Sequence, residues 1–435
     1  MSKKKTVILG AGLSGLSAAW HLQKKRIDCL VFEKESEAGG LCRSKRLKGF
    51  TFDHDGHLLH FRQRYTFNLV KRLLGDNLLE HKRSSWVYTY DRYIPYPFQA
   101  NLYGLPPLVA KECLCDFIRA FHQSKPGNKK NLNFYDWINH NFGKGIARHF
   151  MIPYNSKFWT VPLKKLTCEW LDGFIPVPSL SRVIEGAGAK NRMPLGYNAR
   201  FWYPKQGGIA SLSRALSGEL KNIHTGCRVT EINLKRKEIK TASGDKEKYD
   251  VLISTIPLPE IPGLIKDIPR EIRLLFGKLK WNSIFNLNLG IERNDLDGKH
   301  WIYFPQKETC FFRVGFYHNF SAGLTPRGAG ALYVEISYSP EKPIEKKNIL
   351  GKVKHQLEGV GILENTNSIK AVDMNDIKYG YPIYDNNYHS ARKNILKLLK
   401  QNGILSCGRY GGWRYMSMEN AILEGKKMAE VYIKQ

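Results

Sequence analysis

The sequence predicts an α/β fold that begins with a Rossmann-like unit, and three neighbouring features support this prediction. An apolar strand at residues 5–9 runs into a glycine turn at residues 10–15 with the spacing GxGxxG. An amphipathic helix is expected over residues 13–25, and a second strand ends at Glu33. Because strand, turn, helix, strand and acid fit within the roughly 30 residues of one βαβ unit, the pattern predicts a dinucleotide site.

Each residue type in this unit has a physical task. Gly10 permits the tight turn, Gly12 lets the backbone approach a pyrophosphate, and Gly15 allows the helix to pack closely. Glu33 accepts hydrogen bonds from ribose hydroxyls, and the positive end of the helix faces the phosphates. At this point nicotinamide and flavin dinucleotides both fit the pattern.

Further along the chain, apolar periodicity predicts an inserted helical domain and a second, antiparallel, substrate-facing sheet between residues 282 and 338. Helices are expected at residues 65–74, 108–122, 134–150, 209–220 and 420–433. Strands are expected at residues 52–59, 86–90, 92–95, 227–232, 249–255, 285–290, 301–304, 311–316, 332–337 and 404–409. Those at 227–232 and 249–255 are expected to return to the nucleotide unit.

Composition limits the classes of partner. The chain of 435 residues is long enough for two or three connected units. Its 68 lysines and arginines outnumber 39 acids, and the net charge of +29 favours anionic partners. The basic residues are dispersed and form no nucleic-acid module, so no nucleic-acid partner is expected. Eight cysteines without CxxC or His/Cys spacing predict reduced thiols and no metal site.

The sequence also predicts a cytoplasmic protein without an integral membrane segment. No apolar run approaches the roughly 20 residues of a membrane span. The first residues, MSKKK, lead directly into the strand at residues 5–9 without the apolar segment of a signal peptide. The oligomeric state stays open.

The residues after Glu33 narrow the choice of cofactor. Residues 37–44, EAGGLCRS, combine a glycine pair with Arg43, and this continuation resembles the FAD-dependent amine oxidase and protoporphyrinogen oxidase-like superfamily. Further segments resemble the UDP-galactopyranose mutase family, particularly its eukaryotic-type branch. They are DGH at 55–57, YPFQ at 96–99, PYNSKFW at 153–159, WIYFP at 301–305 followed by Phe312 and Arg313, GYP at 380–382 and GRYGGWRY at 408–415.

This resemblance implies a domain order. It implies a Rossmann-like FAD-binding domain with an inserted helical domain and an antiparallel substrate-facing sheet. The FAD-binding domain is expected to take residues 1–95, 201–275 and 376–435. The helical insertion is expected at residues 96–200 and the sheet domain at residues 276–375.

The resemblance also implies a chemistry. In such mutases FAD is active when reduced, here with NADPH or NADH as the expected reductant. Its N5 attacks the anomeric carbon of the sugar, UDP leaves, and a covalent flavin–sugar intermediate lets the ring open and reclose. UDP-galactopyranose and UDP-galactofuranose, or a related nucleotide sugar, are thus interconverted without net oxidation, in cell-surface polysaccharide biosynthesis.

Transferred residue by residue, the resemblance implies three groups of site residues. The implied FAD contacts are Gly10, Gly12, Leu13, Ser14, Gly15, Glu33, Lys34, Gly40, Leu41, Arg43, Gly56, His57, Val229, Gly408, Arg409, Tyr415 and Met418. The implied substrate contacts are Tyr96, Phe98, Gln99, Asn155, Trp159, Tyr303, Arg313, Tyr381 and Tyr415. The implied catalytic group is His57, Arg313, Tyr381 and Tyr415, in which His57 sits beside the flavin and is not a general base.

Two departures from the family pattern bear on the substrate. Phe174 stands where the family has the first of two diphosphate arginines, and Arg182, Arg192 or Arg200 is the expected substitute. Asp55 replaces a glycine beside the flavin, where a carboxylate disfavours extra negative charge on the reduced ring.

Two other functions stay open. An FAD-dependent oxidase or desaturase of the amine oxidase or protoporphyrinogen oxidase type has the same cofactor fold. A non-catalytic flavin- or nucleotide-binding protein on this scaffold accounts for Phe174 and Asp55. The joint presence of Arg313, Tyr381 and Tyr415 favours the mutase, because a diphosphate still needs recognition.

Overall fold

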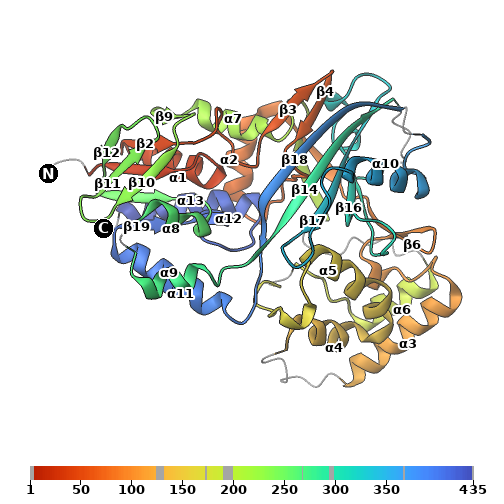
Figure 1. The fold of residues 1–435 in the computed structure, drawn as a ribbon. Helices are drawn as coiled ribbons and strands as arrows, with labels where there is room; N and C mark the ends of the chain where they lie inside the picture. The colour runs from red at the N-terminus through yellow and green to blue at the C-terminus, as the bar shows by residue number, and fades with distance from the viewer. Residues whose placement is uncertain are drawn as a thin grey trace.

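A five-stranded parallel sheet organises the half of the molecule that holds both chain ends (Figure 1). The computed structural model describes residues 4–123, 132–171, 174–189, 199–266, 268–292, 298–365 and 368–433. The strand order is β19-β13-β1-β2-β9, so β1 is central. The strands are β1 (Thr6–Leu9), β2 (Cys29–Phe32), β9 (Ile223–His224), β13 (Val251–Ser254) and β19 (Ile404–Ser406).

Both faces of this sheet are covered, which is why β1 and β13 are buried at every residue. Ile8 belongs to the core cluster that includes Leu16 of helix α1 (Leu13–Lys24) and Ala429 of helix α13 (Met418–Ile433). Val7, on the other face, belongs to the cluster that includes Ile395 of helix α11 (Tyr388–Gln401). The near-continuous apolar sequence of these strands follows from this double covering.

The last helix lies against the first (Figure 1). The Ser14 hydroxyl donates to the Ala421 carbonyl at 2.9 Å, and the Ser17 hydroxyl donates to the Ile422 carbonyl at 2.6 Å. At Gly425 an added Cβ would lie 2.4 Å from the Ser14 carbonyl oxygen, so α13 approaches α1 more closely than a larger residue permits. The C-terminal segment thereby supports the helix whose N-terminus faces the site described below.

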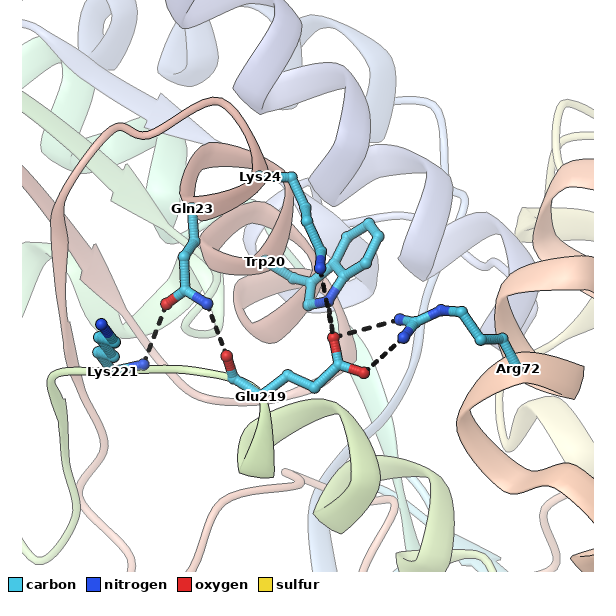
Figure 2. A network of polar contacts seen from close by, with 6 residues as sticks. All are labelled: Trp20, Gln23, Lys24, Arg72, Glu219 and Lys221. Atoms are coloured by element: carbon cyan, nitrogen blue, oxygen red, sulfur yellow. Dashed lines mark hydrogen bonds and ion pairs between the residues drawn. The ribbon is translucent and has the colours of Figure 1, made fainter.

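Glu219, directly after helix α7 (Ala210–Gly218), ties α7 to two other helices (Figure 2). Its carboxylate accepts from Trp20 Nε1 of α1 at 2.7 Å, and from both Nη atoms of Arg72 in helix α2 (Arg64–Leu74) at 2.7 and 3.2 Å. Its backbone carbonyl accepts from Gln23 Nε2 at 2.6 Å. The hydrogen bonds from Arg72 lower the pKa of Glu219, so this carboxylate stays ionised and fixes α1.

The other half is built on a seven-stranded, mainly antiparallel sheet with the order β18-β14-β17-β16-β15-β6-β7. Only β15 and β6 pair in parallel. Helix α10 (Ile349–Gly359) packs on one face through Val353 and Leu357 (Figure 1). The strands are β6 (Ser85–Thr89), β7 (Arg92–Pro95), β14 (Trp281–Ile291), β15 (Trp301–Tyr303), β16 (Arg313–Phe316), β17 (Gly330–Tyr338) and β18 (Ile369–Pro382).

A group of helices lies beside the lower end of this sheet in Figure 1. They are α3 (Pro107–Gln123), α4 (Phe134–Ile146), α5 (Ile152–Trp159) and α6 (Leu180–Gly188). The chain is helical over the predicted range 134–150, but this helix is not continuous, because α4 is kinked and ends at Ile146. Gly143 has a φ of 73°, and a wide π-helical turn over Ala147–Met151 leads into α5. This break redirects α5 toward the sheet.

The remaining elements form small sheets and short helices. Two antiparallel pairs are β3 (Ser44–Leu47) with β4 (Phe50–Asp53), which form a hairpin, and β5 (Leu78–Lys82) with β8 (Arg200–Pro204). A three-stranded antiparallel sheet contains β10 (Val229–Asn233), β11 (Glu238–Thr241) and β12 (Lys246–Lys248). The short helices are α8 (Ile261–Leu264), α9 (Arg270–Phe276) and α12 (Gly408–Gly411).

Three placements differ from the sequence prediction. Strand β6 pairs with β15 and β7 pairs with β6, so the hairpin expected in the FAD-binding segment 1–95 belongs to the seven-stranded sheet. The strand at 227–232 joins the three-stranded sheet and not the parallel one. The boundary expected at residue 375 falls inside β18, because this edge strand continues unbroken alongside β14.

All eight cysteines lie in the described ranges and are free thiols, and four of them are buried. The described residues contain no group of three His, Cys, Asp or Glu side chains placed to hold a metal ion. Among the described helices, none has both the length and the apolar composition needed to cross a membrane.

Candidate active site

A cavity of about 730 Å³ lies at the carboxyl ends of β1, β2 and β13 and extends to the seven-stranded sheet. This edge of a parallel sheet is where ligands bind in open α/β folds. Of the predicted site residues, the following line the cavity: Gly10, Gly12, Leu13, Ser14, Glu33, Lys34, Gly40, Leu41, Arg43, Gly56, His57, Tyr96, Gln99, Asn155, Trp159, Val229, Tyr303, Arg313, Tyr381, Gly408, Arg409, Tyr415 and Met418.

The glycine turn forms one end of the cavity. Gly10 has a φ of +90°, a conformation that favours glycine. Gly15 does not line the cavity; it lies against the turn, where an added Cβ would be 1.9 Å from the Gly10 carbonyl oxygen. Gly12 is the N-cap of α1 and supplies no capping side chain, so first-turn amides at Leu13 and Ser14 lie at the cavity wall. This arrangement fits a phosphate group.

Glu33 and Arg43 flank this turn. Glu33 is 6% exposed, and its carboxylate accepts from the Ala11 amide at 2.7 Å and from the Glu35 amide at 3.0 Å. The carboxylate keeps further lone pairs for ligand hydroxyls. Arg43 donates through Nε to the Gly40 carbonyl at 2.8 Å, while its Nη1 is 3.5 Å from Glu35 Oε2. Such a long ion pair leaves donors of Arg43 for an anion.

A buried amide and two tyrosines line another part of the wall. Gln99 is 1% exposed, and its Nε2 donates to the Pro176 carbonyl at 2.8 Å. Its Oε1 has no hydrogen-bond partner among the described residues. The rings of Tyr96 and Tyr303 lie 5.0 Å apart at 50°. A flat base with an N–H donor suits such a site, because it satisfies the orphaned oxygen and contacts the rings.

Phe98, predicted as a substrate contact, does not line the cavity. It is fully buried and stacks on Phe150, with ring centroids 5.0 Å apart and planes at 21°. Phe150 itself lines the cavity. Within the short turn Phe98–Ala100, Phe98 therefore supports the wall while its neighbour Gln99 forms it.

Arg313 is already paired with a carboxylate. Its Nη2 donates to Glu335 Oε1 at 2.7 Å and its Nε donates to Glu335 Oε2, which gives a two-pronged ion pair. Glu335 is fully buried and hydrogen-bonded to Asp55. Burial raises the pKa of Asp55, and burial together with the charge of Asp55 raises the pKa of Glu335 to about 8. The two carboxyls thus share a proton near neutral pH, and with Arg313 they form a group of zero net charge.

Arg409 is the opposite case, a half-buried cation without a carboxylate partner among the described residues. Its Nη atoms donate to the carbonyls of Met416 and Gly380 at 3.2 Å each, and its Nε has no partner. The guanidinium lies 4.8 and 4.9 Å from the ring centroids of Tyr381 and Tyr415. A half-buried cation that has no carboxylate partner among the described residues, and whose Nε lacks an acceptor there, suits an anionic or electron-rich ligand.

The histidine at the wall is neutral. Burial lowers the pKa of His57 to about 4, and its Nδ1 lies 2.9 Å from the Asp55 carbonyl oxygen, so Nδ1 carries the proton. His57 is consequently a poor proton acceptor through Nδ1.

Phe174 lines the cavity and packs edge-on against Tyr415, with centroids 4.5 Å apart. Neither of the two expected substitute arginines that the structure describes lines the cavity. Arg200 pairs with Glu80 at 2.6 Å, Arg182 is on α6 outside the lining, and Arg192 lies outside the described residues. The cations that line the cavity are instead Lys34, Arg43, Arg228, Arg313, Lys378 and Arg409.

Sequence reasoning missed Glu335, Arg228 and Lys378. Glu335 carried a signal, because it is the only charged residue in the apolar run of β17, and an acid in a buried strand requires a partner. Arg228 and Lys378 lie in polar stretches where nothing in the pattern separates a cavity residue from a solvated one.

These features give the cavity two chemistries. One end presents backbone amides and Glu33 to a phosphate and a ribose, which suits a dinucleotide. The other presents Gln99, Arg313, Arg409 and tyrosine hydroxyls. Burial raises the pKa of Tyr96, Tyr303 and Tyr381, so these hydroxyls stay protonated and can donate to an anion.

A family model described as flavin containing amine oxidoreductase matches residues 13–433. Among solved structures, a crystal structure of reduced UDP-galactopyranose mutase superposes with a TM-score of 0.94 and 27% sequence identity. This superposition covers 100% of this chain and 94% of that one.

Curated relatives match by shorter or more distant alignments. The FAD-containing monooxygenase EthA of Mycobacterium tuberculosis is 37% identical over 93 residues, which are 21% of this chain and only 19% of that protein. Coproporphyrinogen III oxidase of Bacillus subtilis is 20% identical over 330 residues, covering 68% of this chain and 69% of that protein. The names of these two relatives have no substrate in common.

Proposed function

Because this chain belongs to the family of flavin containing amine oxidoreductases, we propose that it is an FAD-dependent mutase acting on a UDP-sugar. The observation that carries the proposal is that one continuous cavity joins the glycine turn to the wall containing Gln99, Arg313 and Arg409. The similarity over the whole chain to reduced UDP-galactopyranose mutase supports the same reading of the cavity. The proposed reaction interconverts UDP-galactopyranose and UDP-galactofuranose.

The residues present fit FAD. The glycine turn and the N-terminal amides of α1 suit its diphosphate, and Glu33 suits a ribose. Arg43 would hold the diphosphate from the other side, and the orphaned Nε of Arg409 would meet the flavin or the substrate diphosphate. Bound and reduced, FAD supplies a nucleophilic nitrogen for the anomeric carbon of the sugar.

The protein's own contribution is positional and electrostatic. Gln99 orients the base through its free oxygen, and Trp159 and Tyr303 exclude water around it. Arg313 and the hydroxyls of Tyr381 and Tyr415 stabilise the diphosphate as negative charge develops on the leaving group. His57 stays neutral and positions the ring, so no side chain at the wall needs to move a proton in the first bond-breaking step.

The test uses purified protein loaded with FAD. Under anaerobic conditions with dithionite, incubation with UDP-galactofuranose is expected to yield UDP-galactopyranose, separated by chromatography. The oxidised protein is the matched control and is expected to be inactive, because the nitrogen is nucleophilic only in the reduced cofactor. If the reduced, fully flavinated protein neither binds UDP nor isomerises any nucleotide sugar, the proposal fails.

The names of other sequence relatives, an oxidase and two carotenoid-type desaturases, favour a second candidate, an FAD-dependent oxidase or desaturase. Its signature is the flavin spectrum. Anaerobic addition of a substrate of that kind bleaches oxidised flavin stoichiometrically, whereas a mutase substrate leaves the oxidation state unchanged over many turnovers. A screen of UDP-, dTDP- and GDP-sugars with spectra recorded during incubation separates the two functions.

A further inference from the structure

A second cavity of about 920 Å³ lies on the other side of helix α5, and no residue lines both cavities. Helix α5 divides them. Asn155 and Trp159 face the first cavity, while Ser156 and Lys157 face the second. The facing wall of the second cavity is formed by β17, by residues 305–310 and by residues 342–344.

The rim of this second cavity is strongly cationic. It contains Lys144, Arg148, Lys307, Lys342 and Lys352, all exposed, and no carboxylate among the residues that the structure describes lines the cavity. Arg148 pairs with Glu112 outside the cavity at 2.8 Å. Within the described ranges, no ion pair forms at the other four cations. Glu308 follows Lys307 in the chain but does not line the cavity.

The floor combines polar groups with buried positions. Lys157 is 7% exposed and donates to the carbonyls of Phe304 and Phe311 at 2.8 and 3.0 Å, and to the Thr309 hydroxyl at 3.0 Å. Burial lowers the pKa of Lys157 to about 7, so the charge of the site comes mainly from the rim. Ser337 is 4% exposed, and its hydroxyl has no hydrogen-bond partner among the described residues.

The positive charges of these side chains repel one another across the cavity unless an anion is bound between them. Four of the five rim cations are lysines, compact point charges that suit phosphate oxygens without a fixed geometry. Ser337 is among the polar residues that line this cavity.

We propose that this cavity is a second ligand site, separate from the active site, which binds a molecule carrying two or more phosphate groups. The phosphates contact the rim lysines, and an uncharged part of the ligand fits against Ile152 and Ile336. A soluble phosphorylated metabolite and a phospholipid headgroup both present this chemistry. The proposal does not depend on the reaction assigned to the first cavity.

The experiment uses charge reversal in the FAD-loaded full chain. Lys307→Glu/Lys342→Glu/Lys352→Glu is compared with Lys393→Glu/Lys397→Glu/Lys400→Glu, which reverses three exposed lysines of α11 and changes the net charge equally. Binding of inorganic tripolyphosphate is measured by calorimetry. Co-sedimentation with vesicles that contain cardiolipin, a lipid with two phosphates, against phosphatidylcholine vesicles, is measured in parallel.

Tripolyphosphate affinity is expected to fall about tenfold or more in the cavity variant and to stay near the wild-type value in the α11 variant, because only the former loses charge-assisted contacts. Loss confined to tripolyphosphate assigns the site to a soluble ligand, and loss of vesicle binding assigns it to a headgroup. Equal weakening in both variants, or unchanged binding in the cavity variant, overturns the proposal. An Arg313→Ala variant that retains the same binding event confirms that the event is outside the first cavity.

Discussion

The two ends of the first cavity are built in different ways. The cradle end, residues 10–14 with Glu33, is made mostly of backbone, and one local βαβ unit provides it. The cation end, Arg313, Arg409, Tyr381 and Tyr415, is made of side chains carried by β16, β18 and the C-terminal segment. A backbone-built site is sensitive to added volume, whereas a side-chain-built site is sensitive to the balance of charge.

The largest effect is expected from added volume at the cradle end. In Gly15→Ala the new Cβ would lie 1.9 Å from a backbone oxygen, which cannot move aside without opening the turn. We expect a loss of about 3 kcal/mol of unfolding free energy and of FAD retention. Thermal denaturation and the flavin-to-protein absorbance ratio measure the two effects.

Gly218→Ala is the matched control. Gly218 is at the end of α7, and an added Cβ there meets no atom within 4 Å. This variant is expected to keep the wild-type flavin content and to gain a few tenths of a kcal/mol. Full FAD retention by Gly15→Ala would contradict the view that backbone spacing builds this end.

The next effect is expected from charge at the cation end. Arg313→Ala leaves Glu335 buried without its cation, so we expect about 3 kcal/mol less stability and about a hundredfold lower kcat/KM. The double variant Arg313→Ala/Glu335→Gln removes the stranded carboxylate. It should recover most of the stability but none of the activity, measured by denaturant unfolding and by chromatographic assay. Equal activity in the double variant and the wild type would exclude a role for Arg313 in the reaction.

A third effect depends on pH. The folded pKa of Glu335, about 8, lies above its ordinary value, so stability falls as pH rises from about 4.5 to 8. Over the upper part of this range the group of Asp55, Glu335 and Arg313 changes from zero to one negative charge, and UDP binding should weaken several-fold. Asp55→Asn removes one carboxyl, lowers the pKa of Glu335 and should abolish this weakening. Calorimetric titration of UDP between pH 6.5 and 9 measures the difference.

The difference between the cradle end and the cation end also explains which parts of the structure could be predicted from the sequence. The strand, turn and helix over residues 5–25 are fixed by local patterns, and the structure has them as β1 and α1. The sequence analysis did not predict strand β18. This strand lies at a sheet edge, where exposed residues such as Asp376 and Lys378 are polar and obscure the pattern of apolar residues that marks a strand. The cation end requires the register of strands far apart in sequence, which no local pattern contains, so its residues came from a family resemblance.

The directions in which side chains point could not be predicted from the sequence either. The neighbours Phe98 and Gln99 face opposite ways in one short turn, so the same segment gave one residue placed in the core and one at the wall. Glu335 is visible in the sequence as an isolated acid, but its partners Arg313 and Asp55 are 22 and 280 residues away and are identified only by the fold.

The smallest effect is expected from adding a charge at the cation end. Phe174 lies beside Tyr415, where the family resemblance predicts an arginine, and none of the described substitutes reaches the wall. Phe174→Arg places a second unpaired cation near Arg409 and should tighten UDP binding about threefold at low salt, with less gain at high salt because surface charges are screened. Phe174→Leu, which changes volume without charge, should leave UDP affinity near the wild-type value. If Phe174→Arg instead weakens UDP binding at every salt concentration, the aromatic contact with Tyr415 matters more than charge at this end. The statement that the cation end is sensitive mainly to the balance of charge would then be wrong.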